Sequence, residues 1–135
     1  LIQSWLDVRI SIWFQWKSGD NPADVWSHFG MLRNDGSDRL SFKSAKVLVD
    51  TLRDCKFVER IDAKDDALFV LKFLREATGE TVYAIWTSGA ESEINLPLEG
   101  KFARVSLLGE KSDVSIDAAT KWKVDGAPVY LTEQK

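Results

Sequence analysis

Two aspartates near the start of the chain are the first residues whose type and spacing could do chemistry. Asp20 and Asp24 lie four residues apart in a segment that also contains Pro22. Two carboxyl groups can act as acid and nucleophile only where their surroundings raise the pKa of one and lower that of the other. Nothing around this pair in the sequence creates such a difference. We therefore interpret both as loop residues that are solvated or hydrogen-bonded within a turn.

Aromatic side chains are the second candidate group, because they crowd into the first thirty residues. They are Trp5, Trp13, Phe14, Trp16, Trp26 and Phe29. A small core does not require this density, whereas a cleft that binds sugars often has it, since an indole buries the apolar face of a sugar ring. Trp13 and Trp16 are three residues apart, so on a strand they would point to opposite faces. Only one of them can then face a cleft.

Histidine and cysteine occur once each, as His28 and Cys55. A single histidine excludes a His-based metal cluster, and a single cysteine excludes both an internal disulfide and a Cys-based zinc site. We interpret Cys55 as a small buried residue, and His28 as either a structural hydrogen-bonding residue or a contact to a sugar hydroxyl. No phosphate-binding loop or nucleophile elbow is present. We expect neither a metal nor a cofactor.

Composition narrows the classes of partner. The 135 residues include 18 basic and 21 acidic side chains, a net charge of -3, and no basic tract that would bind nucleic acid. No apolar run has the roughly 18 residues that a membrane span needs, and no signal peptide is visible. We expect no membrane partner. The compartment stays open, since secreted enzymes often lack disulfides, and a secreted or periplasmic location is compatible with the sequence.

The elements that must hold these residues differ between the two halves of the chain. In the first half, apolar spacing predicts a short helix ending near Asp7, then a strand from Ile10 to Trp16. A polar loop with several turn-forming residues follows. The spacing from Ser41 to Leu52 predicts an amphipathic helix beside the strand, with Ser41 as its N-cap.

The second half alternates short apolar runs with turn compositions every eight to twelve residues, which predicts an antiparallel sandwich. The strands are expected at Phe57–Ile61, Leu68–Arg75, Val82–Thr87, Glu93–Leu96, Phe102–Leu108, Val114–Ile116, Trp122–Val124 and Val129–Leu131. Asp125-Gly126 between two of these runs predicts a type I′ hairpin. Since 135 residues fall short of the roughly 250 of a complete (β/α)8 barrel, and the chain begins at Leu1 within a helical pattern, we expect a truncated protein.

Several short motifs follow one another along the chain: ISIWFQWKSGDNP from Ile10, HFGML from His28, YAIWT from Tyr83, Leu96-Pro97 and PVYL from Pro128. Taken in this order, they resemble the end of (β/α)8-barrel (TIM-barrel) glycoside hydrolases of the cellulase and xylosidase type. The resemblance implies an α+β chain, with the last β/α unit of a barrel in residues 1–55 and an accessory β-sandwich in residues 56–135. In such enzymes the two catalytic carboxyl groups come from strands four and seven, so the resemblance implies that they precede Leu1 and that this chain carries no catalytic residue.

The same resemblance implies a cleft for an oligo- or polysaccharide that the parent enzyme binds together with its remaining barrel segment. Trp16 lies nearest the end of the expected strand, where barrel active sites lie, and is our choice for a stacking platform. Trp26 and His28 on the following loop, and Asp20 in its acidic turn, are the other expected substrate contacts. We expect the chain alone to be inactive.

Two other classes remain open. The chain could be a stand-alone carbohydrate-binding module with Tyr83, Trp86, Trp122 and Tyr130 on one sandwich face, although strand alternation favours the core for Trp86 and Trp122. It could also be a non-catalytic interaction domain. An unpaired barrel strand would make the first half prone to association, whereas we expect the part from Lys56 onward to associate less.

Overall fold

The computed structural model describes residues 1–8, 10–13, 15–21 and 23–134. The strands are β1 (Cys55–Arg60), β2 (Leu68–Arg75), β3 (Glu80–Thr87), β4 (Ser92–Asn95), β5 (Gly100–Val105), β6 (Lys111–Ile116), β7 (Lys121–Val124) and β8 (Val129–Glu133). The helical segments are α1 (Ile2–Trp5), the 3-10 turn η1 (Val25–His28) and α2 (Leu40–Leu52). Each strand overlaps one predicted from the turn spacing, so that part of the sequence analysis is confirmed.

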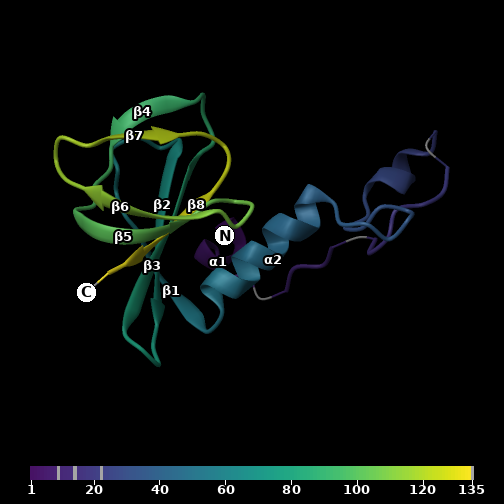
Figure 1. Ribbon diagram of the computed structural model, residues 1–135, viewed down its shortest axis with the longest axis horizontal. Coiled ribbons are helices and arrows are strands. Elements are labelled where there is room, and N and C mark those ends of the chain that lie inside the picture. Colours follow the sequence, from purple (N-terminus) through teal and green to yellow (C-terminus); the bar gives the residue numbers. More distant parts are fainter. Residues whose placement is uncertain (9, 14, 22, 135) are drawn as a thin grey trace.

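The strands form two sheets in which every pairing is antiparallel (Figure 1). Six strands are ordered β1-β2-β3-β8-β5-β6, and β4 pairs with β7 in a second, two-stranded sheet. The fold is therefore α+β, mostly antiparallel sheet with few helices, and it is consistent with the expected sandwich.

Two apolar cores lie on opposite faces of the six-stranded sheet. The first fills the space between the sheets, and its fully buried members include Val70 and Leu131. The second lies under α1 and α2. Strand β3 serves both, because alternate residues of a strand point to opposite faces: Tyr83 and Ile85 join the first core, whereas Val82, Ala84 and Trp86 join the second. The continuous apolar run of this strand therefore reflects burial on both sides.

The helix α2 packs differently from the prediction. Its residues Val47, Leu48 and Leu52 contact the second core on the six-stranded sheet, and not a strand at Ile10–Trp16. The expected N-cap is also wrong: Arg39 occupies that position without a side-chain cap hydrogen bond, and Ser41 lies inside the first turn. The free face of the sheet offers the helix an apolar surface, which decides where its amphipathic stripe is buried.

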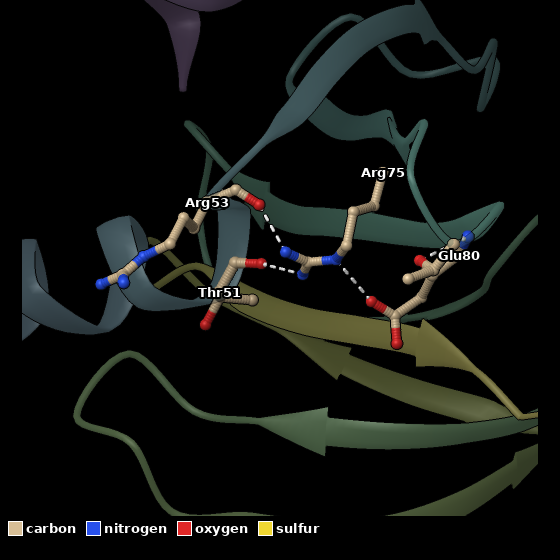
Figure 2. A network of polar contacts seen from close by, with 5 residues as sticks. Thr51, Arg53, Arg75 and Glu80 are labelled. Carbon is tan, nitrogen blue, oxygen red and sulfur yellow. Dashed lines mark hydrogen bonds and ion pairs between the residues drawn. The ribbon is translucent and has the colours of Figure 1, made fainter.

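The C-terminal end of α2 is fastened to the sheet by Arg75 of β2 (Figure 2). One guanidinium nitrogen of Arg75 donates to the carbonyl of Thr51 at 3.0 Å, and another donates to the carbonyl of Arg53. The Nε of Arg75 donates to Glu80 at 2.8 Å. The last carbonyls of a helix lack partners within it, so Arg75 supplies donors where α2 needs them.

Two expectations about local structure are wrong. No described residue of the 10–16 segment belongs to a strand, and Phe14 lies outside the described residues. A strand needs a neighbour that continues its ladder of hydrogen bonds, and among the described residues only Met31 and Leu32 donate backbone hydrogen bonds to this segment, at its end. Asp125-Gly126 is also not a hairpin turn, because β7 pairs with β4 while β8 pairs with β3 and β5. Gly126 does not adopt the positive φ that a type I′ turn requires.

Candidate functional site

The four predicted substrate contacts lie in one loop region that extends beyond the N-terminal end of α2, away from the sheets (Figure 1). Short contacts between its two arms hold the region together. Ser18 N–H donates to the carbonyl of Leu32 at 2.9 Å, and Leu32 N–H donates to the carbonyl of Trp16 at 3.0 Å. Isolated bridges join Leu32 to Lys17 and to Asp38. The loop therefore has a defined internal structure without belonging to either sheet.

Asp24 has a structural task in this loop. Its carboxylate accepts a hydrogen bond at 3.1 Å from the backbone N–H of Trp26 and so caps η1. The prediction that turn hydrogen bonding explains Asp24 is confirmed. Asp20 is exposed, and its expected contact with substrate stays a prediction.

The tryptophans of the loop are largely exposed. Trp16 is 62% exposed, and its ring meets that of Phe42 in α2 edge-on at 5.5 Å. Trp26 is 59% exposed and lies 5.8 Å from the ring of Phe29. His28 ends η1 and is exposed as well. The structure thus brings the four predicted residues into one loop region, in which two indoles are more than half exposed.

Close packing and unsatisfied polar atoms mark the base of the loop. A Cβ on Gly30 would lie 2.6 Å from the carbonyl carbon of Lys17, so the two arms approach closely only because residue 30 is glycine. Nearby, the side-chain atoms Gln15 Oε1, Ser18 Oγ and Arg39 Nε are buried without a partner. Buried polar atoms are normally hydrogen-bonded, so these three are exceptions within the part of the chain that the structure describes.

A cavity of about 450 Å³ lies between α1, α2 and the six-stranded sheet. Trp13 lines it together with Trp86 and Tyr130, whereas the four predicted contact residues do not. Trp13 is anchored by a hydrogen bond from its indole N–H to the carbonyl of Phe29 at 3.0 Å. In the sequence, only strand alternation bears on the position of Trp13, and no sequence signal pairs it with the sheet residues that share its cavity.

The described residues contain no group of three or more histidine, cysteine or acidic side chains that could hold a metal ion. Within the same part of the chain, none of the helices has the length and apolar character needed to cross a bilayer. What the loop offers chemically is therefore aromatic surface, hydroxyl and amide groups, and scattered charges.

Fold and loop together define an α+β chain in which a two-sheet body carries an aromatic-rich loop at one end. Its structure is similar to that in "Structural insights into a family 39 glycoside hydrolase from the gut symbiont Bacteroides cellulosilyticus WH2", with a TM-score of 0.72 and 26% identity. The match covers 88% of this chain and 25% of the other. No family model matches the chain, and no curated protein does.

The structural likeness supports a relationship to glycoside hydrolases. The chain spans about a quarter of the length of the enzyme that it matches.

Proposed function

We propose that the chain is the C-terminal part of a glycoside hydrolase, made of the last β/α unit of a (β/α)8 barrel in residues 1–55 and an accessory β-sandwich in residues 56–135. Its role is to supply aromatic walls to a sugar-binding cleft and a structural sandwich. The catalytic carboxylates belong to the other barrel strands. The observation that carries this proposal is the likeness to a family 39 glycoside hydrolase over 88% of this chain but only 25% of that one.

The distribution of exposed apolar residues supports the proposal. Large exposed hydrophobic side chains are concentrated before residue 50: Ile2, Leu6, Val8, Ile10, Ile12, Trp13, Trp16, Val25, Trp26, Phe29, Leu40 and Val49. Ile10 is 75% exposed and Ile12 is 87% exposed. A concentration of exposed apolar side chains marks an interaction site, and the remaining barrel segment is the partner that we propose for it.

Within this proposal, Trp16 is the stacking platform for a sugar ring, and Trp26 forms a wall of the same cleft. Asp20 and His28 contact sugar hydroxyls. These roles need the four side chains to reach solvent, and all four are exposed. The alternative of a sandwich face built from Tyr83, Trp86 and Tyr130 is not favoured, because these three side chains are buried.

The length of the native polypeptide in the source material tests the proposal. An antibody raised against the 135-residue chain should detect a polypeptide about four times as long, given the share of the matched enzyme that this chain covers. Peptide sequencing of that band should show a barrel segment before Leu1. A single species of this chain's own mass, in material protected from proteolysis, would contradict the proposal.

Activity gives a second test. The purified chain should not hydrolyse aryl glycosides above background, whereas the longer polypeptide should. Turnover by the clean 135-residue chain that disappears with Asp20→Asn would overturn the assignment of the catalytic groups to the missing strands.

A further inference from the structure

The side chain of Arg104 in β5 lies on the face of the six-stranded sheet that is turned toward the second sheet. Phe102, two residues earlier on the strand, is buried between the two sheets. Residues i and i+2 of a strand share a face, so Arg104 projects to the same side. Its side chain lines a cavity of about 250 Å³ that lies between β5, β7 and β8.

The guanidinium of Arg104 makes no hydrogen bond or ion pair with any described residue. Arg60 and Arg75, by contrast, donate to backbone carbonyls or to a carboxylate. A guanidinium has five donors, and those of the partly buried Arg104 have no acceptor among the described residues.

Two further side chains complete the lining of this cavity. Trp122 of β7 is half-buried, packs against the core between the sheets and presents its remaining surface to the cavity. Asp125 follows β7, and its Oδ1 accepts a hydrogen bond from Ala127 N–H at 2.7 Å, which fixes the carboxylate and leaves acceptor capacity free. The cavity thus holds an indole surface, guanidinium donors that make no contact with a described acceptor, and a carboxylate held by a backbone N–H.

A second cavity of about 260 Å³ adjoins the first. It is lined by Arg104 and Asp125 as well, and it extends over the β5–β6 turn to Leu108 and Glu110. The turn and the β7–β8 connection lie on the side of the sheets where the chain's N-terminus lies (Figure 1). The two cavities therefore form one cleft, which we call the Arg104 cleft, distinct from the aromatic loop before α2.

We propose that the Arg104 cleft is a binding site for one neutral pyranose unit. Trp122 covers the apolar face of the ring, Arg104 donates to its hydroxyls and Asp125 accepts from them. Each hydroxyl both donates and accepts, so this pair of side chains matches a sugar in a way that neither would alone.

Charge and size argue for a neutral single ring. Two basic and two acidic side chains line the cleft: Arg104, Lys123, Glu110 and Asp125. Lys123 is already paired with Glu91 at 2.9 Å. The part of the cleft that Trp122 lines has a volume of about 250 Å³, below the roughly 300–1,000 Å³ of typical ligand pockets, which suits one ring better than an oligosaccharide. The choice of a sugar rests on the proposed glycoside hydrolase relationship, while the site itself is independent of catalysis.

NMR titration of the isotope-labelled 135-residue chain tests the proposal, with methyl β-glucoside and methyl β-xyloside as probes. One or both should shift the indole N–H signal of Trp122 and the Nε–H signal of Arg104 in a saturable manner. Arg104→Met should weaken binding about tenfold or more, since it removes hydrogen bonds made by a charged donor. The indole N–H signal that is lost in the Trp122→Phe variant is thereby assigned to Trp122.

Lys101→Met is the matched control, because Lys101 lies on the same strand but is exposed on its other face. It should leave binding unchanged, and circular dichroism should show that all variants are folded. Absence of any saturable shift, equal weakening by both substitutions, or binding of glucuronate in preference to the neutral sugars would overturn the proposal. None of these results would change the length of the native polypeptide, so failure here and failure of the proposed function are distinguishable.

Discussion

Glycine 30 sets the geometry of the aromatic loop at the scale of a single residue. The two arms of the loop meet where a Cβ on this residue would collide with the backbone of Lys17. The carbonyl and amide groups that join the arms, including those of Ser18 and Leu32, depend on this approach. The positions of Trp16 and Trp26 therefore depend on a residue without a side chain.

Replacing Gly30 with alanine should open this loop. We expect the Gly30→Ala substitution to lower the free energy of local opening by about 1–3 kcal/mol, the usual cost of forcing extra atoms into a packed site. Hydrogen exchange at the Ser18 amide measures it. Gly126→Ala is the control, because a Cβ there would meet only an atom 3.9 Å away. Equal exchange rates in the two variants would contradict the assigned role of Gly30.

The two tyrosines should make the protein sensitive to alkali. Burial raises the pKa of Tyr130 to about 12, and burial together with a hydrogen bond to Glu133 raises that of Tyr83. A folded pKa above the unfolded value of about 10 gives stability that is complete below about pH 10 and is lost as pH rises toward 12. For Tyr130 this amounts to about 2–3 kcal/mol.

Tyrosinate absorbance followed together with circular dichroism checks this prediction. Ionisation of the tyrosines should coincide with unfolding instead of preceding it. Tyr130→Phe removes an ionisable hydroxyl. The free energy of unfolding of this variant should therefore fall less between neutral pH and pH 12 than that of the unchanged protein. Titration of both tyrosines near pH 10 in a folded protein would contradict this prediction.

At the scale of elements, polar and cation–π contacts fix both helices to the sheet. The guanidinium of Arg60 lies 4.5 Å from the centre of the Phe69 ring and 5.1 Å from that of Trp5 in α1. At the C-terminal end of α2, Arg75 donates hydrogen bonds to the backbone carbonyls of Thr51 and Arg53. Apolar burial holds the helices down, and these arginines determine their positions along the sheet.

Removing the Arg75 contacts should loosen α2. We expect Arg75→Met to lower the free energy of unfolding by about 1.5–3 kcal/mol, because the lost donor is charged and 78% of its side chain is shielded, with 22% exposed. Arg53→Met removes only an exposed ion pair with Asp50 and should cost about 0.5 kcal/mol or less. Urea denaturation of both variants measures the difference. A smaller effect at position 75 than at position 53 would refute the fastening role.

At the scale of the whole molecule, the apolar surface before residue 50 should cause association. We expect light scattering to show oligomers of the 135-residue chain. They should dissociate in the Ile10→Ser, Ile12→Ser double variant, since these two side chains are the most exposed large hydrophobic ones among the described residues. A full chain that stays monomeric at high concentration would count against a barrel partner for this surface.

Truncation tests how the two cores depend on each other. From the sequence, the part from Lys56 onward was expected to associate less than the whole chain. The second core, however, lies between that part and both helices. Deleting residues 1–54 should uncover Leu71, Phe73, Val82, Ala84, Trp86 and Tyr130, and should therefore increase association in light scattering. A stable monomeric sandwich would show that the six-stranded sheet does not need its helical cover.

The sequence by itself determined the strands, the helix α2 and the burial of Trp86. These follow from local information: period-two alternation, three-and-four spacing and turn residues at regular intervals. Leu68–Arg75 coincides with β2 residue for residue, and Leu40–Leu52 differs from the predicted helix by one residue. The resemblance to barrel glycoside hydrolases, and not a local pattern, was what put Trp26 and His28 on the loop that follows Trp16.

Only the tertiary structure decided which elements meet. The pairing of β7 with β4, the packing of α2 on the six-stranded sheet and the convergence of Arg104, Trp122 and Asp125 join residues far apart in the sequence. Local patterns say that an apolar face must be buried but not against what. The partner of each face is chosen by the total area that the assembled chain can bury, and that quantity exists only once the chain has folded.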